Sequence, residues 1–260
     1  MVRALETGAL PFEPVSLIKG LTSSELGVIE SFIVVVASYP PTKSSGKGVM
    51  SNLEHPEDEN NPSLRRLKVV LAGFNGDPSI VLHAKSDPDP SVRVACLGAL
   101  ERLGIIKADD IRAALDDPDS KVRRRGCEIA AKVKGKGSRS TITETLISAL
   151  QDSDPLVVEG ACWALGERQD KKAVSALCEL SSDHRDPRCR EAALAALGAI
   201  GDSAGLTAIL DRLEDKPQIR RRAVVALAAF EGDKVDAALT RSLDDRDWQV
   251  RQAAQALLAD

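Results

Sequence analysis

Residues that could carry catalysis or bind a metal are few in this chain and lie far apart in the sequence. Its 260 residues include three histidines, His55, His83 and His184. None of them is adjacent to a glutamate, and no two have the spacing of metal ligands. No Ser/His/Asp or Cys/His combination suited to nucleophilic catalysis can be proposed either. The sequence therefore predicts no catalytic, cofactor-binding or metal-binding site.

The cysteines are expected to be structural rather than reactive. They are odd in number, form no CxxC pair and fall within expected helices, which is typical of small buried hydrophobic side chains in a reducing compartment: Cys96, Cys127, Cys162, Cys178 and Cys189. The first residues do not pair a basic start with an apolar stretch, and the apolar run from Phe32 to Tyr39 is far too short to span a membrane. We expect a cytoplasmic protein.

A basic segment is the strongest local irregularity in charge. Residues 61–150 carry 16 basic and 11 acidic side chains, and eight of the basic ones lie between Lys121 and Arg139 against a single Glu128. Such a run is usually a solvated helix face followed by a mobile loop. The alternative is a patch for an acidic partner or a phosphate backbone. The net charge of −4 and an aromatic content of 3% argue against nucleic acid.

Trp163 is a second irregularity, because aromatic residues are rare in this chain. Glu159 and Glu167 lie four residues to either side of it and therefore on the same helix face. An exposed tryptophan there would be an anchor for a partner. The alternative is that its ring fills core space left by Gly160 and Gly166.

An internal repeat must position these residues. Segments such as VRVACLGAL, VRRRGCEIA and IRRRAVVAL recur with an apolar residue, then arginine, then small residues and a later apolar pair. The spacings are 28, 30, 35, 32, 30 and 31 residues between the equivalent positions Arg65, Arg93, Arg123, Val158, Arg190, Arg220 and Arg251. The small residues that follow lie on one face of a helix, where they would let neighbouring helices approach closely.

Each of these helices is preceded by a start signal, in most cases an Asn or Asp followed by proline, as at Asp154–Pro155. A second set of helices is expected between them, at Asp109–Leu115, Ser140–Leu150, Asp170–Leu180, Ser203–Leu213 and Asp233–Leu243. Two helices for roughly every 31 residues make an α-solenoid unit.

The pattern resembles HEAT-like repeats of the kind found in bilin lyases and bacterial scaffold proteins. The resemblance rests on an acidic residue six positions before the arginine: Asp87/Arg93, Asp117/Arg123, Asp152/Val158, His184/Arg190, Glu214/Arg220 and Asp245/Arg251. In that family these residues form a ladder that links successive turns. Val158 and His184 depart from the pattern. The resemblance implies an all-α fold, a right-handed α-solenoid of about six to seven HEAT-like helix pairs.

Three regions follow from this register. Residues 1–39 are expected to form a degenerate helical cap, residues 40–60 a flexible acidic linker, and residues 61–260 the HEAT-like repeat array.

The fold suggests a non-catalytic scaffold that binds a protein or peptide on its concave face. The candidate partner-binding residues are Arg124, Arg125, Glu128, Glu159, Trp163, Glu167, Glu191 and Arg221. One alternative is an enzyme or chaperone subunit resembling bilin lyases, with the basic segment meeting the propionates of a tetrapyrrole. Others are phosphate-backbone binding through residues 121–139 and a resemblance to HEAT-like alkylpurine glycosylases. HEAT-repeat hydroxylases that modify a lysine derivative use His-Glu pairs, and this sequence has none.

Overall fold

The computed structural model describes residues 60–133 and 139–259, and in these ranges the secondary structure is helical, with no strand. The predicted cap at residues 1–39 and nearly all of the predicted linker at 40–60 lie outside the described residues. The chain divides into two compact units, Met1–Ala99 and Leu100–Asp260. Their boundary falls within one helix.

The described part of the first unit contains α6 (Pro62–Asn75), α7 (Pro78–His83), a short 3₁₀ turn (Ala84–Ser86) and most of α8 (Pro90–Arg102). Asn61 caps α6 by accepting a hydrogen bond from the backbone N–H of Ser63 at 3.0 Å. Proline follows the cap at the first helical position, where its missing N–H costs nothing.

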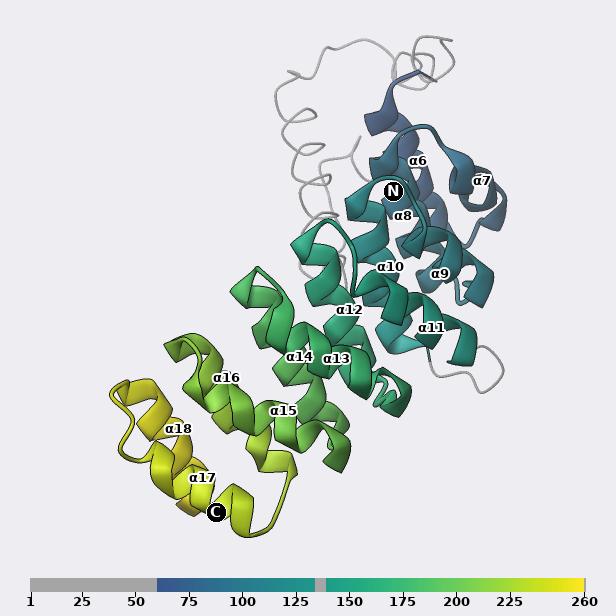
Figure 1. Cartoon of the computed structure of the whole chain (residues 1–260). Helices are drawn as coiled ribbons and strands as arrows, with labels where there is room; N and C mark the ends of the chain where they lie inside the picture. The colour runs from purple at the N-terminus through teal and green to yellow at the C-terminus, as the bar shows by residue number, and fades with distance from the viewer. Residues whose placement is uncertain (1–59, 134–138, 260) are drawn as a thin grey trace, which may run out of the picture. The chain divides into compact units, whose positions relative to one another are not determined.

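The second unit alternates two sets of helices (Figure 1). One set carries the predicted arginine register and comprises α10 (Ser120–Lys132), α12 (Pro155–Glu167), α14 (Pro187–Ile200), α16 (Pro217–Ala226) and α18 (Trp248–Ala259). The other set comprises α9 (Ala108–Leu115), α11 (Arg139–Ala149), α13 (Val174–Asp183), α15 (Leu206–Asp211) and α17 (Asp233–Ser242). Short 3₁₀ turns extend several of these helices, as at Lys171–Ala173 before α13.

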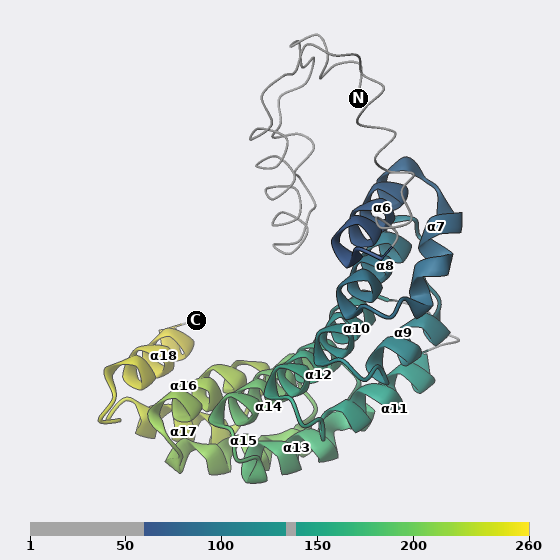
Figure 2. The ribbon, with the colours of Figure 1, turned by 90° about the horizontal axis from the view of Figure 1, so that it is seen from above.

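Figure 2 shows how the two sets are arranged within residues 100–259. Helices α10, α12, α14, α16 and α18 lie on the inside of the curve, and α9, α11, α13, α15 and α17 lie on the outside. Successive inner helices pack on one another, and each outer helix packs against an inner one. The predicted all-α, right-handed α-solenoid is confirmed.

Small residues set the close approach between inner helices. A Cβ added at Gly198 of α14 would lie 3.0 Å from both Cα and Cβ of Ala226 on α16, and one at Gly166 of α12 would lie 3.2 Å from Cα of Ala196 on α14. The predicted small-residue line is buried at Gly126, Ala161, Ala193, Ala223 and Ala254. The sparse aromatic content is therefore consistent with a core of closely stacked helices filled by Ala, Val, Leu and Ile.

No helix in the described part of the chain combines the length and the apolar character needed to cross a membrane.

Candidate functional site

The arginine register forms a ladder along the turns that precede the inner helices, and we refer to each Arg–Asp pair as a rung. In each rung the arginine binds the aspartate of the following repeat. Arg123 Nε lies 2.6 Å from Asp152 Oδ2, and Arg220 Nη2 lies 2.7 Å from Asp245 Oδ1. Hydrogen bonding to the Arg220 guanidinium holds the pKa of Asp245 below its ordinary value, although partial burial opposes this. The prediction of a ladder linking successive turns is confirmed.

Each arginine makes a second contact, with the turn of its own repeat. Arg123 Nη1 donates to the backbone carbonyl oxygens of Asp117 at 2.9 Å and Pro118 at 3.0 Å. Arg251 does the same with Asp245 and Arg246. Within one repeat, the arginine therefore binds the backbone carbonyl of the residue six positions before it. The carboxylate of that residue binds the arginine of the preceding repeat.

One predicted ladder residue is wrong by a single position. The carboxylate that binds Arg190 belongs to Asp215, at 3.3 Å, and not to Glu214. Asp215 also supplies the carbonyl that accepts from Arg220, at 2.8 Å. Glu214 is exposed and lies 3.8 Å from Arg241. In this turn the aspartate precedes the arginine by five residues instead of six. A fixed repeat register does not reveal this difference.

The two departures from the register, Val158 and His184, belong to the same rung. An arginine at position 158 would meet an aspartate at position 184, and both are replaced. Val158 is fully buried, and its side chain supplies no N–H donor to the turn of its own repeat. His184 keeps the other roles of the aspartate: its Nδ1 accepts from the backbone N–H of Asp186 at 3.1 Å, and its carbonyl oxygen accepts from Arg190 at 2.8 Å.

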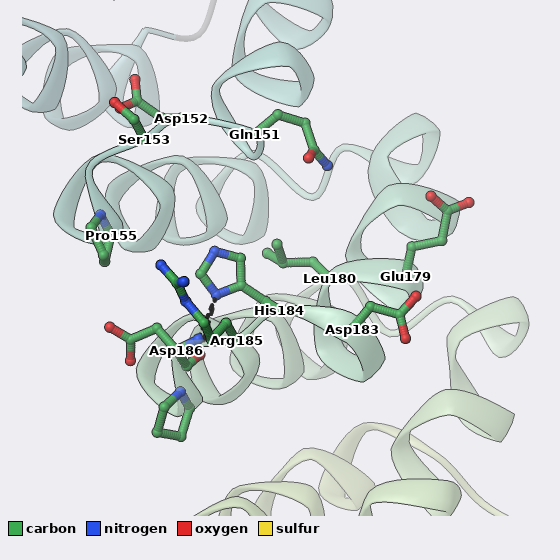
Figure 3. Close-up of a pocket in the computed structure, with 11 residues that line it drawn as sticks. Gln151, Asp152, Ser153, Pro155, Glu179, Leu180, Asp183, His184, Arg185 and Asp186 are labelled. Atoms are coloured by element: carbon green, nitrogen blue, oxygen red, sulfur yellow. Dashed lines mark hydrogen bonds between the residues drawn. The ribbon is translucent and has the colours of Figure 1, made fainter.

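A polar pocket of about 800 Å³ lies where this rung is missing (Figure 3). It is bounded by the turn before α12 and by the end of α13 with the turn before α14. The lining residues are Gln151, Asp152, Ser153, Pro155, Glu179, Leu180, Asp183, His184, Arg185, Asp186 and Pro187. The close-up shows the His184 ring between the two walls, with Glu179 and Asp183 on one side and Asp152 and Ser153 on the other. The sequence marked both replaced positions but did not predict a pocket beside His184.

Trp163 lies on the inner helix α12 with 47% of its surface exposed, so its ring does not fill the core. Glu167, one turn along the helix, is exposed as well, and Glu159 is half-buried. Glu159 Oε1 lies 3.8 Å from Arg188 Nε at the start of α14. The predicted tryptophan flanked by glutamates is therefore present on the inner face.

A shallow apolar groove lies between α14 and α16. Its volume is about 160 Å³, and its lining consists of small side chains with one arginine: Ala195, Gly198, Ala199, Arg222, Val225, Ala226, Ala228 and Ala229. Ala195 and Val225 occupy the same register position in their helices as Trp163 does in α12. Large and small apolar side chains thus follow one line along three successive inner helices.

One ion pair and one hydrogen bond between neighbouring inner helices border this apolar line at its C-terminal end. Glu191 Oε1 of α14 lies 3.2 Å from Arg222 Nη2 of α16. Arg221 Nη1 donates to Gln249 Oε1 of α18 at 3.2 Å. Of the predicted candidates here, Glu191 is therefore partly occupied by a structural pair, and Arg221 contacts the next inner helix.

Much of the basic segment is neutralised within the molecule. Arg125 is largely buried and lies 2.8 Å from Glu101 and 2.9 Å from Glu128. Lys132 Nζ also binds Glu101, at 2.9 Å. Arg124 is exposed and lies 3.5 Å from Glu128. Because Arg123 belongs to the ladder and Arg125 is largely buried, the basic residues of the described helix α10 that remain exposed are Lys121, Arg124 and Lys132. The predicted loop residues 134–138 lie outside the described residues.

A buried polar network was missed at the sequence level. Arg168 ends α12 with only 3% of its side chain exposed, and its Nε donates to Asp170 Oδ2 at 2.7 Å. Its Nη1 donates to the carbonyl oxygens of Ala130 and Val133, both at 3.1 Å, at the end of α10. Thr143 of α11 donates to the same Asp170 oxygen at 2.7 Å. The network joins three helices, and its signal in the sequence is only an Arg and an Asp two residues apart.

The cysteines of the second unit are buried or half-buried. Burial raises the pKa of Cys127 to about 12 and that of Cys189 to about 11, so neither thiol is ionised at neutral pH. In the described part of the chain no group of three or more His, Cys, Asp or Glu side chains is arranged to hold a metal ion.

Comparison with known proteins agrees with the repeat geometry. The model for HEAT repeats matches residues 108–198, 143–218 and 182–259. Deoxyhypusine hydroxylase of Arabidopsis thaliana is 35% identical over 102 residues, which cover 38% of this chain and 31% of the hydroxylase. This chain thus spans about a third of the length of that relative.

Solved structures show the same fold. The complex of CpcE and CpcF of phycocyanin lyase from Nostoc sp. PCC7120 superposes with a TM-score of 0.51 at 24% identity, over 70% of this chain and 75% of that one. An engineered protein superposes with a TM-score of 0.52 at 20% identity, over 69% of this chain and 96% of that one. The stacked helix pairs, the ladder of Arg–Asp rungs and the family match over more than half of the sequence together show that the chain belongs to the HEAT-repeat family.

Proposed function

We propose that this chain is a non-catalytic scaffold that binds a protein or peptide along the inner face of α12, α14 and α16. The observation that carries the proposal is the exposure of Trp163 on that face, in line with the apolar groove between α14 and α16. A large aromatic side chain held on a stacked helix loses little conformational entropy when a partner covers it. Exposed tryptophans of this kind are frequent binding hot spots.

The shape of the apolar line favours an extended polypeptide over a small molecule. Inner helices pack about 8–10 Å apart, so the line from Trp163 through Ala195 to Val225 crosses roughly 20 Å. The groove beside it is shallow, which suits a chain segment that lays small apolar side chains across several repeats. The charged residues at its borders would set register and selectivity more than affinity.

Phosphate-backbone binding through the basic segment has less support. Arg123, Arg125 and Lys132 are already paired with carboxylates of this chain. A nucleic acid would have to displace those carboxylates before it gained the counterion-release energy of its phosphates.

Photo-crosslinking tests where the partner lies. A photoreactive amino acid is placed at Ala199, which is exposed and lines the inner groove, or at Ala237, an equally exposed alanine on the outer helix α17. We expect a crosslinked polypeptide in native lysate from the Ala199 position and little from the Ala237 position. Equal yields from both positions, or a yield from Ala237 alone, would contradict an inner-face site.

Affinity for the captured partner then tests Trp163. Trp163→Ala should weaken binding about 30-fold, which corresponds to roughly 2 kcal/mol for a hot-spot side chain. Trp248→Ala is the matched control, because Trp248 is 62% exposed but stands at the first position of α18, where α12, α14 and α16 carry a proline. Equal weakening by both substitutions would show that exposed tryptophan in general, and not the inner face, accounts for binding.

A further inference from the structure

The rungs of the second unit differ in strength along the ladder edge, which is the edge of the array formed by the turns before the inner helices. The rung from α10 to α12 is bidentate, because Arg123 Nε and Nη2 donate to the two carboxylate oxygens of Asp152 at 2.6 and 2.9 Å. The rung from α16 to α18 is bidentate as well, through Arg220 and Asp245. Two parallel hydrogen bonds fix the orientation of the groups that they join as well as their distance.

The two rungs between these are missing or weak. Among the described residues, no hydrogen bond or ion pair joins the turn before α12 (151–154) to the turn before α14 (183–186). In the next rung Arg190 makes a single contact with the carboxylate of Asp215, at 3.3 Å, and its Nε is buried without a hydrogen-bond partner. Helix α14 is therefore held only weakly along the ladder edge, on both sides.

The turns before α12 and α14 also have room to move. The 800 Å³ pocket lies between them, and Arg185, which lines it, forms no ion pair within the described part of the chain (Figure 3). Two weak contacts remain nearby, from Cys189 Sγ to the carbonyl oxygen of Pro155 at 3.7 Å and from Arg188 Nε to Glu159 Oε1 at 3.8 Å. Single contacts of this length do not fix the angle between two helices.

Glycines hold the same helices together at their other ends. A Cβ added at Gly166 of α12 or at Gly198 of α14 would lie 3.2 or 3.0 Å from a Cα of the next inner helix, so the backbones nearly touch. The same register position is alanine in the two inner repeats with bidentate rungs, at Ala131 of α10 and at Ala228 just after α16. Within the second unit, close glycine contacts and weak rungs thus occur on the same two helices.

Such a contact can act as a pivot. Backbones that touch without interlocking side chains can roll on one another while they remain packed, as in shear movements of helices. Gly166 lies twelve residues after Asp154, which is about 18 Å along the helix, so a rotation of about 5° at the glycine moves the turn by roughly 1.5 Å. The pocket leaves space for a movement of that size.

We propose that α12, α14 and α16 form a joint in the array. The three helices stay in contact at Gly166 and Gly198, while the turns before them move apart and together along the ladder edge. This movement changes the curvature of the inner face. The joint involves only contacts within this chain, so it is independent of the function proposed above.

Distances between paired spin labels, measured by electron paramagnetic resonance, test the joint in the full chain. The labels are attached to unnatural side chains, so the cysteines stay unmodified. One pair, at Leu156 and Gln218, joins the first turns of α12 and α16, and the matched control pair, at Glu167 and Ala229, joins the opposite ends of the same two repeats. All four residues are exposed, and each pair spans two stacking steps, roughly 16–20 Å between helix axes.

We expect the distance distribution of the Leu156–Gln218 pair to be about twice as wide as that of the control pair, because only the ladder edge moves. Equal widths, or a wider distribution for the control pair, would overturn the proposal.

Restoring the missing rung is the second test. Val158→Arg with His184→Asp supplies both members of the rung, and it should narrow the Leu156–Gln218 distribution by at least about one third while the control pair stays unchanged. Circular dichroism checks that the double variant is folded. An unchanged Leu156–Gln218 distribution in the folded variant would show that the rung does not control the movement, and the proposal would be wrong. If the variant does not fold, the comparison of the two edges in the unmodified chain decides alone.

Discussion

Replacing Arg168 by methionine should destabilise the second unit more than any surface substitution. Arg168 and Asp170 have 3% and 5% of their side chains exposed, so the pair is buried. Removing the guanidinium takes the Arg168 donors away from the Asp170 carboxylate and from the carbonyls of Ala130 and Val133. Breaking a buried ion pair costs about 3–5 kcal/mol, and we expect about 4 kcal/mol for Arg168→Met.

The measurement is urea denaturation followed by circular dichroism. For a unit of this size the loss corresponds to a fall in melting temperature of roughly 8–16 °C. Amide hydrogen exchange should show the increase first at the end of α10 and the start of α11, because stability in a repeat array is local.

Two controls distinguish a buried pair from an ordinary one. The double variant Arg168→Met with Asp170→Leu removes the carboxylate as well and should recover at least about 2 kcal/mol, since apolar replacement of a whole buried pair is often neutral. Arg241→Met breaks an exposed pair with Glu214 and should cost less than about 0.5 kcal/mol. A loss below about 1 kcal/mol for Arg168→Met, or no recovery in the double variant, would refute the reasoning.

Three further predictions follow from packing and protonation. Gly198→Ala places a Cβ 3.0 Å from Ala226, so it should cost about 1–3 kcal/mol in urea denaturation; an unchanged midpoint would mean that α14 and α16 separate freely. The folded pKa of Asp245 lies below its ordinary value, so the stability from that rung is complete above about pH 4 and is lost as the pH falls below it. Urea midpoints measured from pH 6 to pH 3 should therefore fall less steeply in Asp245→Asn than in the unmodified chain, and equal slopes would be evidence against this. A thiol reagent at pH 8 should modify the half-buried Cys178 well before Cys127, whose pKa burial raises to about 12; equal rates would contradict the buried assignment.

The sequence by itself determined the helices and their repeat, because those signals are local. The cap at Asp154 and the proline after it act within one turn of α12, and the small residues follow the 3.6-residue period of a single helix. The predicted inner and outer helices therefore agree with the structure within a few residues. The exception in the ladder, Glu214 for Asp215, arose where one turn is a residue shorter than the others.

Local patterns also left the candidate site undetermined, because its residues depend on contacts between helices. The sequence identified Trp163 as unusual but left its ring either exposed or buried, because exposure depends on how closely α10 and α14 approach α12. Arg125 was a candidate for partner binding, yet Glu101, 24 residues earlier in the chain, holds it. Charge patterning along one helix does not contain that information.

Only the tertiary structure decided which residues from different repeats meet. It joined Val158 and His184, 26 positions apart, into one missing rung with a pocket beside it, and it buried Arg168 against the carbonyls of α10. Such contacts depend on the distance and rotation between successive repeats. Those quantities are set by the small side chains packed between helices, and a local pattern along one helix does not specify them.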